Sequence, residues 1–414
     1  QMERCLPMDE IPNDSSSSSS SQQEEIPPQR KTRSRRALIG PFSLLITLTG
    51  FDLQTSLCGN RNPRCRSIVS TILFTFVVIL FLVRFFFVMS TKAPSLSFGW
   101  ADSNIVGFTA FQSLVALILL ARWTATGVYS QVYTEILTVK RYYTHSLRSS
   151  LHDKSQFILG LVLGVIYVCV TIASSIKSSI YGRYSVEVNG TTIQLHPGYF
   201  IFSIDNLYGA EIVVGIWMAL CTVLATASYV YIHIGVRMEL KKFNDDLIDS
   251  MERKTLLDSL SSFNLRHISL LRLVVLLTDK MSSFASFSTF TILIANVNAF
   301  FQLSSIASAN AFGTVMSILW MLSTSIFLLL VLNPPATIQQ LLQQSTSLVL
   351  NHNELIAHPD KMALAQLMVT RNRVTPTRMA IMNAIVVNTH TPHLITLIVP
   401  AIVAVLSYAK RFQQ

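Results

Sequence analysis

The chain is organised as long apolar runs separated by polar segments. A helix of about 20 residues crosses the hydrocarbon core of a bilayer. The runs lack the strict alternation of a barrel strand, so each predicts a helix that satisfies its own backbone hydrogen bonds. The predicted fold is an all-α membrane domain over residues 67–414 with seven spans. The predicted spans are Ile68–Ser90, Ile105–Leu120, Phe157–Ser175, Ile212–Val236, Phe284–Phe301, Val315–Leu332 and Leu394–Ala409.

A shorter apolar run, Ala37–Thr49, contains Gly40 and Pro41. These residues disfavour a continuous helix through the bilayer. We therefore assign residues 37–66 to a re-entrant or interfacial segment, with an eighth span as the alternative.

Composition supports a membrane protein over a soluble one. Half of the residues are apolar, only 13% are charged, and the mean hydropathy is +0.47. A soluble domain carries about 25% charged residues. The bilayer therefore takes the place of a single large soluble core.

The basic residues predict the orientation, because cytosolic loops are enriched in Lys and Arg. Of the 32 basic residues, 26 lie in the N-terminal region or in the segments 122–156, 237–281 and 333–380. The opposite side holds five, and Arg84 lies inside a run. This asymmetry predicts a cytosolic N-terminus and an extracellular C-terminus. The same topology places the N-glycosylation sequon at Asn189 outside the cell.

Residues 1–36 are predicted to form a disordered cytosolic tail. The run Ser15–Ser21 and the acidic and proline residues after it bury too little apolar area to fold. A basic cluster, Arg30–Arg36, follows and suits the anionic inner leaflet. Because Gln1 precedes a methionine, the sequence leaves the true start of the chain open.

Motifs of enzymes are absent from the sequence. It contains no GxSxG, HExxH, Walker A or GxGxxG string. His390 and His393 form the one close histidine pair, and no carboxylate lies near them in sequence. We therefore predict a protein that is not an enzyme and has no cofactor, no metal site and no nucleic-acid partner.

The segments around the fourth and fifth spans are predicted to be helical beyond the membrane. Residues Tyr229–Asp249 continue the fourth span as a charged helix, and Leu256–Lys280 leads into the fifth span with apolar residues at helical spacing. A protruding helix with an apolar stripe needs a partner, either within the subunit or from another copy.

This architecture resembles the insect gustatory and odorant receptor superfamily, and in particular its nematode gustatory-receptor-like members. The stretch Leu265–Leu271 followed by Asp279–Phe284 resembles the family's passage into its fifth span. The opening Pro41–Leu45 and Thr49–Phe51 resembles its segment before the first span. The C-terminal stretch Leu406–Gln414 departs from the family, which often ends in Thr-Tyr, five apolar residues and Gln-Phe.

The resemblance implies a ligand-gated, nonselective cation channel in the plasma membrane, assembled as a homo- or hetero-tetramer with the last span lining the pore. Its partners would be a small-molecule ligand or another sensory stimulus and the lipid bilayer. The last span is almost entirely apolar, and a ring of such residues closes a pore by dewetting. We predict Thr396, Val399 and Val403 as pore-lining residues. A metabotropic, G-protein-linked receptor and a light or peroxide sensor stay open as alternatives.

Polar and aromatic residues within or beside the spans are the candidates for a ligand pocket. Intramembrane polar groups are functional candidates, although interhelical hydrogen bonding is their commoner use, and tryptophans also serve as interface anchors. The candidates are Trp100, Glu211, Trp217, Asn296, Asn298 and Trp320.

The rhodopsin-like receptors are a poor match. The predicted topology is the reverse of theirs, and no cysteine is placed for their conserved outer disulfide. Asn333–Thr337 begins like an NPxxY motif but has no tyrosine in the fifth position.

Overall fold

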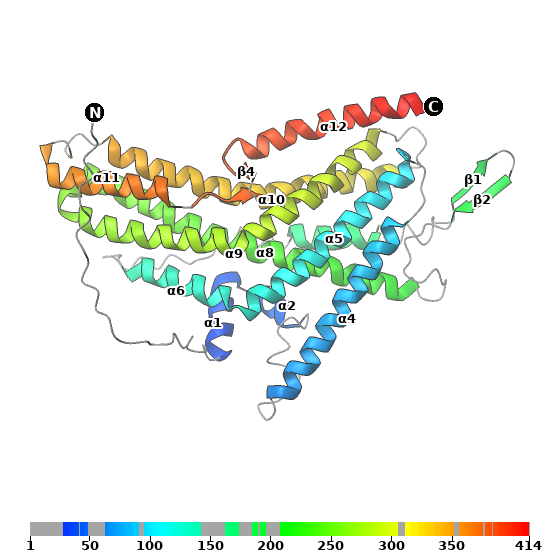
Figure 1. Cartoon of the computed structure of the whole chain (residues 1–414), viewed down its shortest axis with the longest axis horizontal. Helices are drawn as coiled ribbons and strands as arrows, with labels where there is room; N and C mark the ends of the chain where they lie inside the picture. The colour runs from blue at the N-terminus through cyan, green and yellow to red at the C-terminus, as the bar shows by residue number, and fades with distance from the viewer. Residues whose placement is uncertain are drawn as a thin grey trace, which may run out of the picture.

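The computed structural model describes residues 28–40, 42–48, 63–90, 95–141, 162–173, 184–188, 191–195, 208–304, 311–351, 355, 357–375, 377–382 and 384–413. The labelled helices are α1 (Pro28–Ile39), α2 (Phe42–Leu48), α4 (Pro63–Met89), α5 (Phe98–Ala125), α6 (Val128–Arg141), α8 (Tyr208–Glu252), α9 (Leu256–Ser304), α10 (Ala311–Leu350), α11 (Pro359–Val374) and α12 (Thr391–Gln413). The described residues form an elongated bundle in which most of the long helices run roughly along the long axis, whereas α4 is inclined to it and α1 crosses it (Figure 1).

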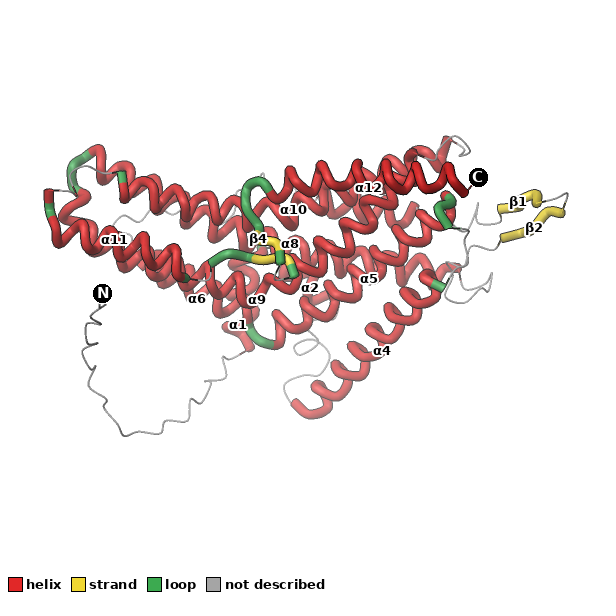
Figure 2. The backbone as a smooth tube through the Cα atoms, turned by 45° about the horizontal axis from the view of Figure 1, so that its top comes forward, coloured by secondary structure: helices red, strands yellow, loops and turns green. Residues whose placement is uncertain are grey.

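Two short antiparallel hairpins interrupt the helical architecture and were not predicted. β1 (Tyr184–Val188) pairs with β2 (Thr191–Leu195), and β3 (Ala380–Ile381) pairs with β4 (Ile385–Val386). β1 and β2 project beyond one end of the bundle, near the C-terminus, whereas β3 and β4 lie against its middle (Figures 1 and 2).

A helix lies at each of the seven apolar runs. Five stretches are long and apolar enough to cross a membrane: Gly99–Ala125, Ile212–Glu252, Leu256–Ser304, Thr314–Leu350 and Thr391–Arg411. The other two runs contain the shorter apolar helices Phe74–Met89 and Val162–Ala173. The chain therefore has the helical architecture of a multi-pass membrane protein.

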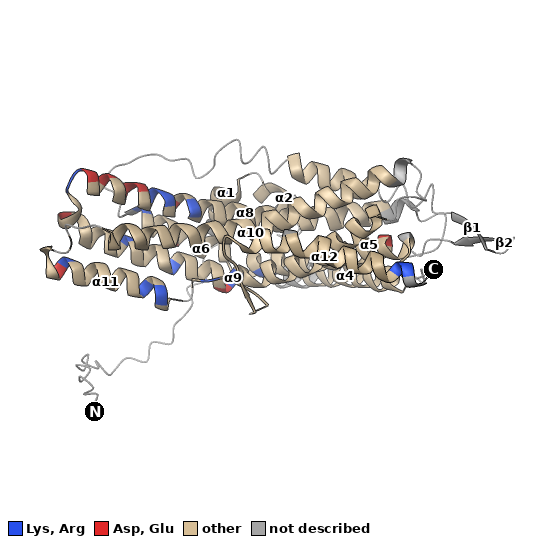
Figure 3. Ribbon diagram, turned by 90° about the horizontal axis from the view of Figure 1, so that it is seen from above, with Lys and Arg blue, Asp and Glu red and all other residues tan. Residues whose placement is uncertain are grey.

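The helices α8 and α9 are much longer than a bilayer is thick. They contain 45 and 49 residues, or roughly 70 Å each, against about 30 Å of hydrocarbon. Charged residues are concentrated in the half of the bundle where these two helices meet, and few lie in the other half (Figure 3). The predicted continuation of both apolar runs as helix is confirmed, and the position of the charged ends outside the membrane stays a prediction. Lys254, at φ +56°, makes the turn between them.

The helix α10 continues where a loop was expected. The predicted span ended at Leu332, before two prolines, yet the helix runs through Pro334 and Pro335 to Leu350. A proline inside a helix leaves the carbonyl four residues earlier without its N–H partner. The hydroxyl of Tyr229 on α8 donates to that carbonyl of Val331 at 3.1 Å, so a tertiary contact replaces the missing bond.

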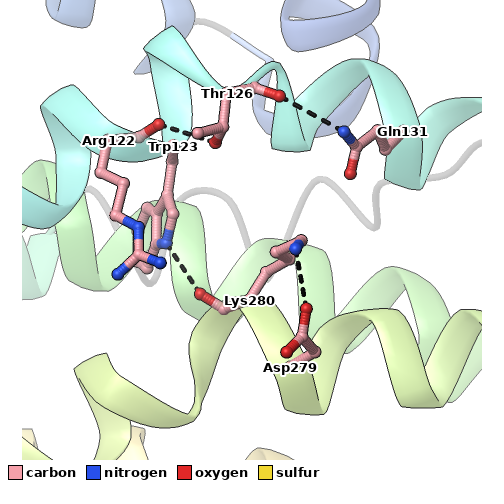
Figure 4. A network of polar contacts seen from close by, with 6 residues as sticks. All are labelled: Arg122, Trp123, Thr126, Gln131, Asp279 and Lys280. Atoms are coloured by element: carbon pink, nitrogen blue, oxygen red, sulfur yellow. Dashed lines mark hydrogen bonds and ion pairs between the residues drawn. The ribbon is translucent and has the colours of Figure 1, made fainter. Parts of the chain in front are cut away.

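The bend between α5 and α6 is fixed by hydrogen bonds within the bend and by one to α9 (Figure 4). Gly127 takes the left-handed conformation at φ +67° that the turn requires. Beside it, the Thr126 hydroxyl donates to the Arg122 carbonyl at 2.8 Å. The indole N–H of Trp123 donates to the Lys280 carbonyl on α9 at 3.1 Å, which ties the bend to the middle of the bundle.

The largest core cluster contains residues from both ends of the chain. Leu38, Ile39, Phe42 and Ile46 of α1 and α2 are buried in it, and so is Ile395 of α12. α1 begins at Pro28, earlier than the tail boundary predicted at residue 36. Residues 1–27, residues 49–62 and the sequon residue Asn189 lie outside the described residues.

Candidate functional site

A pocket of about 260 Å³ lies between the helix Val162–Ala173, α8 and α10. It falls within three of the predicted spans, so a ligand would reach it inside the membrane. Its volume is close to the lower end of the range for small-molecule sites, about 300–1,000 Å³, and is far too small for a folded partner. The lining residues are Leu163, Gly164, Ile166, Tyr167, Val223, Thr226, Ala227, Val230, Tyr231, Ile234, Ser323, Ile326, Phe327 and Leu330.

Aromatic rings form the wall of the pocket on one side. The ring of Tyr167 meets Trp320 edge-on at a centroid distance of 6.5 Å, and it lies 6.1 Å from the ring of Phe327. Edge-to-face pairs of this kind contribute about 0.5–1.5 kcal/mol beyond the area that they bury. Trp320 is itself buried, so it holds Tyr167 in place from behind.

The pocket lining is mainly apolar, and four of its residues carry a hydroxyl group: Tyr167, Thr226, Tyr231 and Ser323. The Thr226 hydroxyl donates to the Thr222 carbonyl at 2.7 Å, which leaves its lone pairs able to accept from a ligand. The pocket is therefore suited to a small, mainly apolar molecule with few polar groups.

Gly164 allows the helix Val162–Ala173 to approach α8 closely. A Cβ atom at this position would lie 2.9 Å from Cγ1 of Val223, a side chain with little rotamer freedom. We expect Gly164→Ala to lower the stability by about 1–3 kcal/mol through overpacking. Thermal melting of the purified protein measures the loss. The double variant Gly164→Ala/Val223→Ala should recover most of it, and no recovery would contradict this packing.

Polar side chains join α5 and α9 across the predicted membrane region. Gln112, which is fully buried, donates to the Ser288 hydroxyl at 2.8 Å and accepts from the Thr291 hydroxyl at 2.6 Å. Nearer the end of the bundle that carries the C-terminus, Asn104 donates to the Asn298 side chain at 3.2 Å. Interhelical bonds of this type contribute about 0.6 kcal/mol each on average in a membrane.

The two predicted asparagines make such interhelical contacts. Asn298 accepts the hydrogen bond from Asn104 on α5. The amide of Asn296 donates to the hydroxyls of Thr324 and Ser325 on α10 at 3.0 and 2.8 Å. Both asparagines are buried, and neither lines the pocket. Their amides join helices in this structure.

The predicted aromatic residues are spread over the bundle rather than gathered at one site. Trp320 lies behind the pocket wall, whereas Trp100 packs edge-on against Phe301 at 6.2 Å. Trp217 is 37% exposed on the surface of α8. Glu211 belongs to α8, and its side chain lies outside the described part of the structure.

The prediction of a pocket missed Tyr167 and Phe327, which contribute most of its aromatic wall. Tyr167 is a tyrosine in the middle of an apolar run, and this anomaly could have identified it. Phe327 is one apolar residue among many in its run, and no feature of the sequence distinguishes it.

α12 lies on the outside of the bundle (Figures 1 and 2). Only 18% of its most apolar stretch is buried, compared with 61% for α5. Of the predicted pore residues, Val399 is buried at 3% exposure, Val403 is half-buried, and the Thr396 side chain lies outside the described part. Exposed residues cover a broad face of α12, and five of them follow its middle line, which we call the α12 stripe: Leu394, Leu397, Ala401, Val405 and Tyr408.

Sequence comparison gives a match to one family. Residues 38–403 match the family described as "Caenorhabditis protein of unknown function, DUF267". No curated protein matches the sequence.

Comparison with solved structures identifies the fold. The insect olfactory receptor OR5 from Machilis hrabei, solved in complex with eugenol, superposes with a TM-score of 0.62 at 14% identity, over 92% of this chain and 100% of that one. A second structure of the same receptor gives a TM-score of 0.60 at 12% identity, over 91% and 99% of the two chains. The chain therefore shares the fold of an insect olfactory receptor over almost its whole length.

Proposed function

Because the chain belongs to the Caenorhabditis family DUF267, whose function is unknown, we propose its function from its fold and from α12. We infer that it is a chemosensory receptor and one subunit of a ligand-gated, nonselective cation channel. The observation that carries the proposal is the uncovered apolar surface of α12. Only 18% of its most apolar stretch is buried within the subunit. Further copies of the chain would cover α12 and would enclose a pore.

The proposed topology has seven spans, a cytosolic N-terminus and an extracellular C-terminus in the plasma membrane. Support comes from the helices at all seven apolar runs and from the charged residues that are concentrated in one half of the bundle (Figure 3). The charged end would face the cytosol, because basic residues favour that side. Asn189, with its sequon, would then be glycosylated outside the cell.

The α12 stripe is the proposed lining of the pore. Its members follow one another at intervals of three, four, four and three residues, the spacing of a seam between helices that pack side by side. Around a central axis, four stripes would face one another. Apolar rings from Leu397 and Val405 would then exclude water and close the pore. The burial of Val399 within the subunit favours this stripe over Val399 as the pore lining.

The proposed ligand is a small, mainly apolar molecule that binds in the pocket beside Tyr167 and Trp320. The pocket size and the four hydroxyl groups support this chemistry. The predicted site residues Trp100, Glu211, Trp217, Asn296 and Asn298 would act at a distance from the ligand, through the packing of the helices.

Two measurements on the intact protein test the proposal. Single-particle imaging of the purified protein should show a tetramer with α12 at the fourfold axis. Cells that express the protein alone should carry a cation current when a panel of small apolar odorants is applied. A monomer, or a verified surface tetramer that stays silent, would contradict the channel. A response that requires G proteins and lacks a current would favour the metabotropic alternative.

A further inference from the structure

The linker between α11 and α12 is held by side chains of α9 and α10. The amide of Gln339 on α10 donates to the Thr377 carbonyl at 2.6 Å, and the Thr278 hydroxyl on α9 donates to the same carbonyl at 3.3 Å. Further along, the Met382 amide donates to the Ser286 hydroxyl of α9 at 3.0 Å. The linker therefore has a defined position on the bundle.

The linker is also joined tightly to the start of α12. The Asn388 side chain accepts from the backbone N–H groups of His390 and Thr391 at 2.9 and 3.0 Å. The Thr391 hydroxyl donates to the Val386 carbonyl of β4 at 3.2 Å. A displacement of the linker would therefore move the first turn of α12.

Tyr229 of α8 makes contact with both α10 and this linker. Its side chain is fully buried, and its hydroxyl donates to the Val331 carbonyl at 3.1 Å while lying 3.5 Å from Sδ of Met379. Because Pro335 has no N–H to give to Val331, the tyrosine hydroxyl is the donor available at this carbonyl. One atom thus joins three parts of the chain.

The wall of the pocket and this junction occupy the same turns of two helices. On α8, Val230 and Tyr231 line the pocket directly after Tyr229. On α10, Leu330 lines the pocket directly before Val331. An occupant that changes the spacing of α8 and α10 at the pocket must therefore change the geometry of the Tyr229 bond.

We propose that Tyr229 is a positioning residue that couples the apolar pocket to the linker carrying α12. The inference rests on the proposed function, since it gives that pocket a ligand and that helix a pore. The coupling between the pocket and the linker can be tested without a ligand and without recording a current. Filling the pocket with a side chain imitates occupancy, and amide hydrogen exchange of residues 377–390 reports on the linker.

The experiment compares four proteins in lipid nanodiscs: the unaltered chain, Ala227→Phe, Tyr229→Phe and the double variant. Ala227 lines the pocket from α8, so the phenylalanine would occupy the cavity. We expect Ala227→Phe to change linker exchange by about threefold or more, the factor that one hydrogen bond controls. In the Tyr229→Phe background, Ala227→Phe should change the logarithm of the linker exchange rate by less than about half as much.

Controls separate coupling from general loosening. Tyr133→Phe removes a hydroxyl from a half-buried tyrosine of α6 and should leave the response to Ala227→Phe intact. Ser323→Phe fills the pocket from α10 and replaces Ala227→Phe if that variant does not fold. An equal response with and without the Tyr229 hydroxyl would overturn the proposal, and so would no response to either filling variant. If the channel is absent but the linker responds through Tyr229, only the proposed function fails.

Discussion

Leu397→Asn is expected to raise the basal cation current of the assembled protein by about tenfold or more. Leu397 is the most exposed of the large side chains in the α12 stripe, at 73%. In the proposed tetramer it forms an apolar ring, and each leucine contributes roughly 1.5–3 kcal/mol to the exclusion of water. Four asparagines would hydrate the ring, and a barrier lower by about 1.4 kcal/mol already gives a tenfold larger current. Patch-clamp recording without stimulus measures the effect.

Two variants serve as controls for this gate. Leu397→Met keeps the ring apolar and should leave the basal current low. Ile402→Asn makes the same kind of change on α12 but outside the α12 stripe, so it should not open the pore. A leak in Ile402→Asn with none in Leu397→Asn would show that a different face of α12 lines the pore.

Arg266→Ala is expected to lower the stability by about 2–3 kcal/mol. The Arg266 side chain is 5% exposed, and its guanidinium lies 2.6 Å from the Asp246 carboxylate and 5.2 Å from the centre of the Phe243 ring. Removing one partner of a buried ion pair leaves the other charge uncompensated. The partial exposure of Asp246, 37%, lets water offset part of that cost.

Arg253→Ala is the matched control because it removes the same charge near the same turn. Its ion pair with Asp249 spans 3.9 Å, and both side chains are mostly exposed, so the expected loss is below about 1 kcal/mol. Thermal melting in detergent compares the two variants. Asp246→Asn should cost less in the Arg266→Ala background than in the unaltered chain. Equal losses for Arg253→Ala and Arg266→Ala would show that the buried pair contributes nothing specific.

Apolar periodicity predicted much of the helical architecture. Runs of apolar residues long enough for a bilayer gave the positions of the helices, because each spanning helix must satisfy its backbone within itself. The protruding part of α9 was also visible in the sequence, since Leu260, Leu271, Val274 and Leu277 recur at helical spacing and are buried. The local pattern of apolar residues was sufficient to predict a helix wherever that helix forms its backbone hydrogen bonds within itself.

The pocket and the long α10 could not be predicted in this way. Both depend on contacts between residues far apart in the chain. Tyr167, Val223 and Phe327 meet only because three helices pack together. The predicted span ended at Leu332, and the hydroxyl of Tyr229, 102 positions away from Val331, supplies the donor that lets α10 continue through its prolines. A single sequence contains no local sign of such partnerships.

The central core has a consequence for the synthesis of the protein. Its members extend from Leu38 in α1 to Ile395 in α12, so the early helices are made long before their partners leave the ribosome. Until α8 and α9 are complete, the faces of α1, α2 and α6 that pack against these two helices are uncovered. Exposed apolar faces make such intermediates prone to aggregation. Chain truncations within α9 should therefore be degraded rather than accumulate, and cellular quality control would set how much full-length protein accumulates.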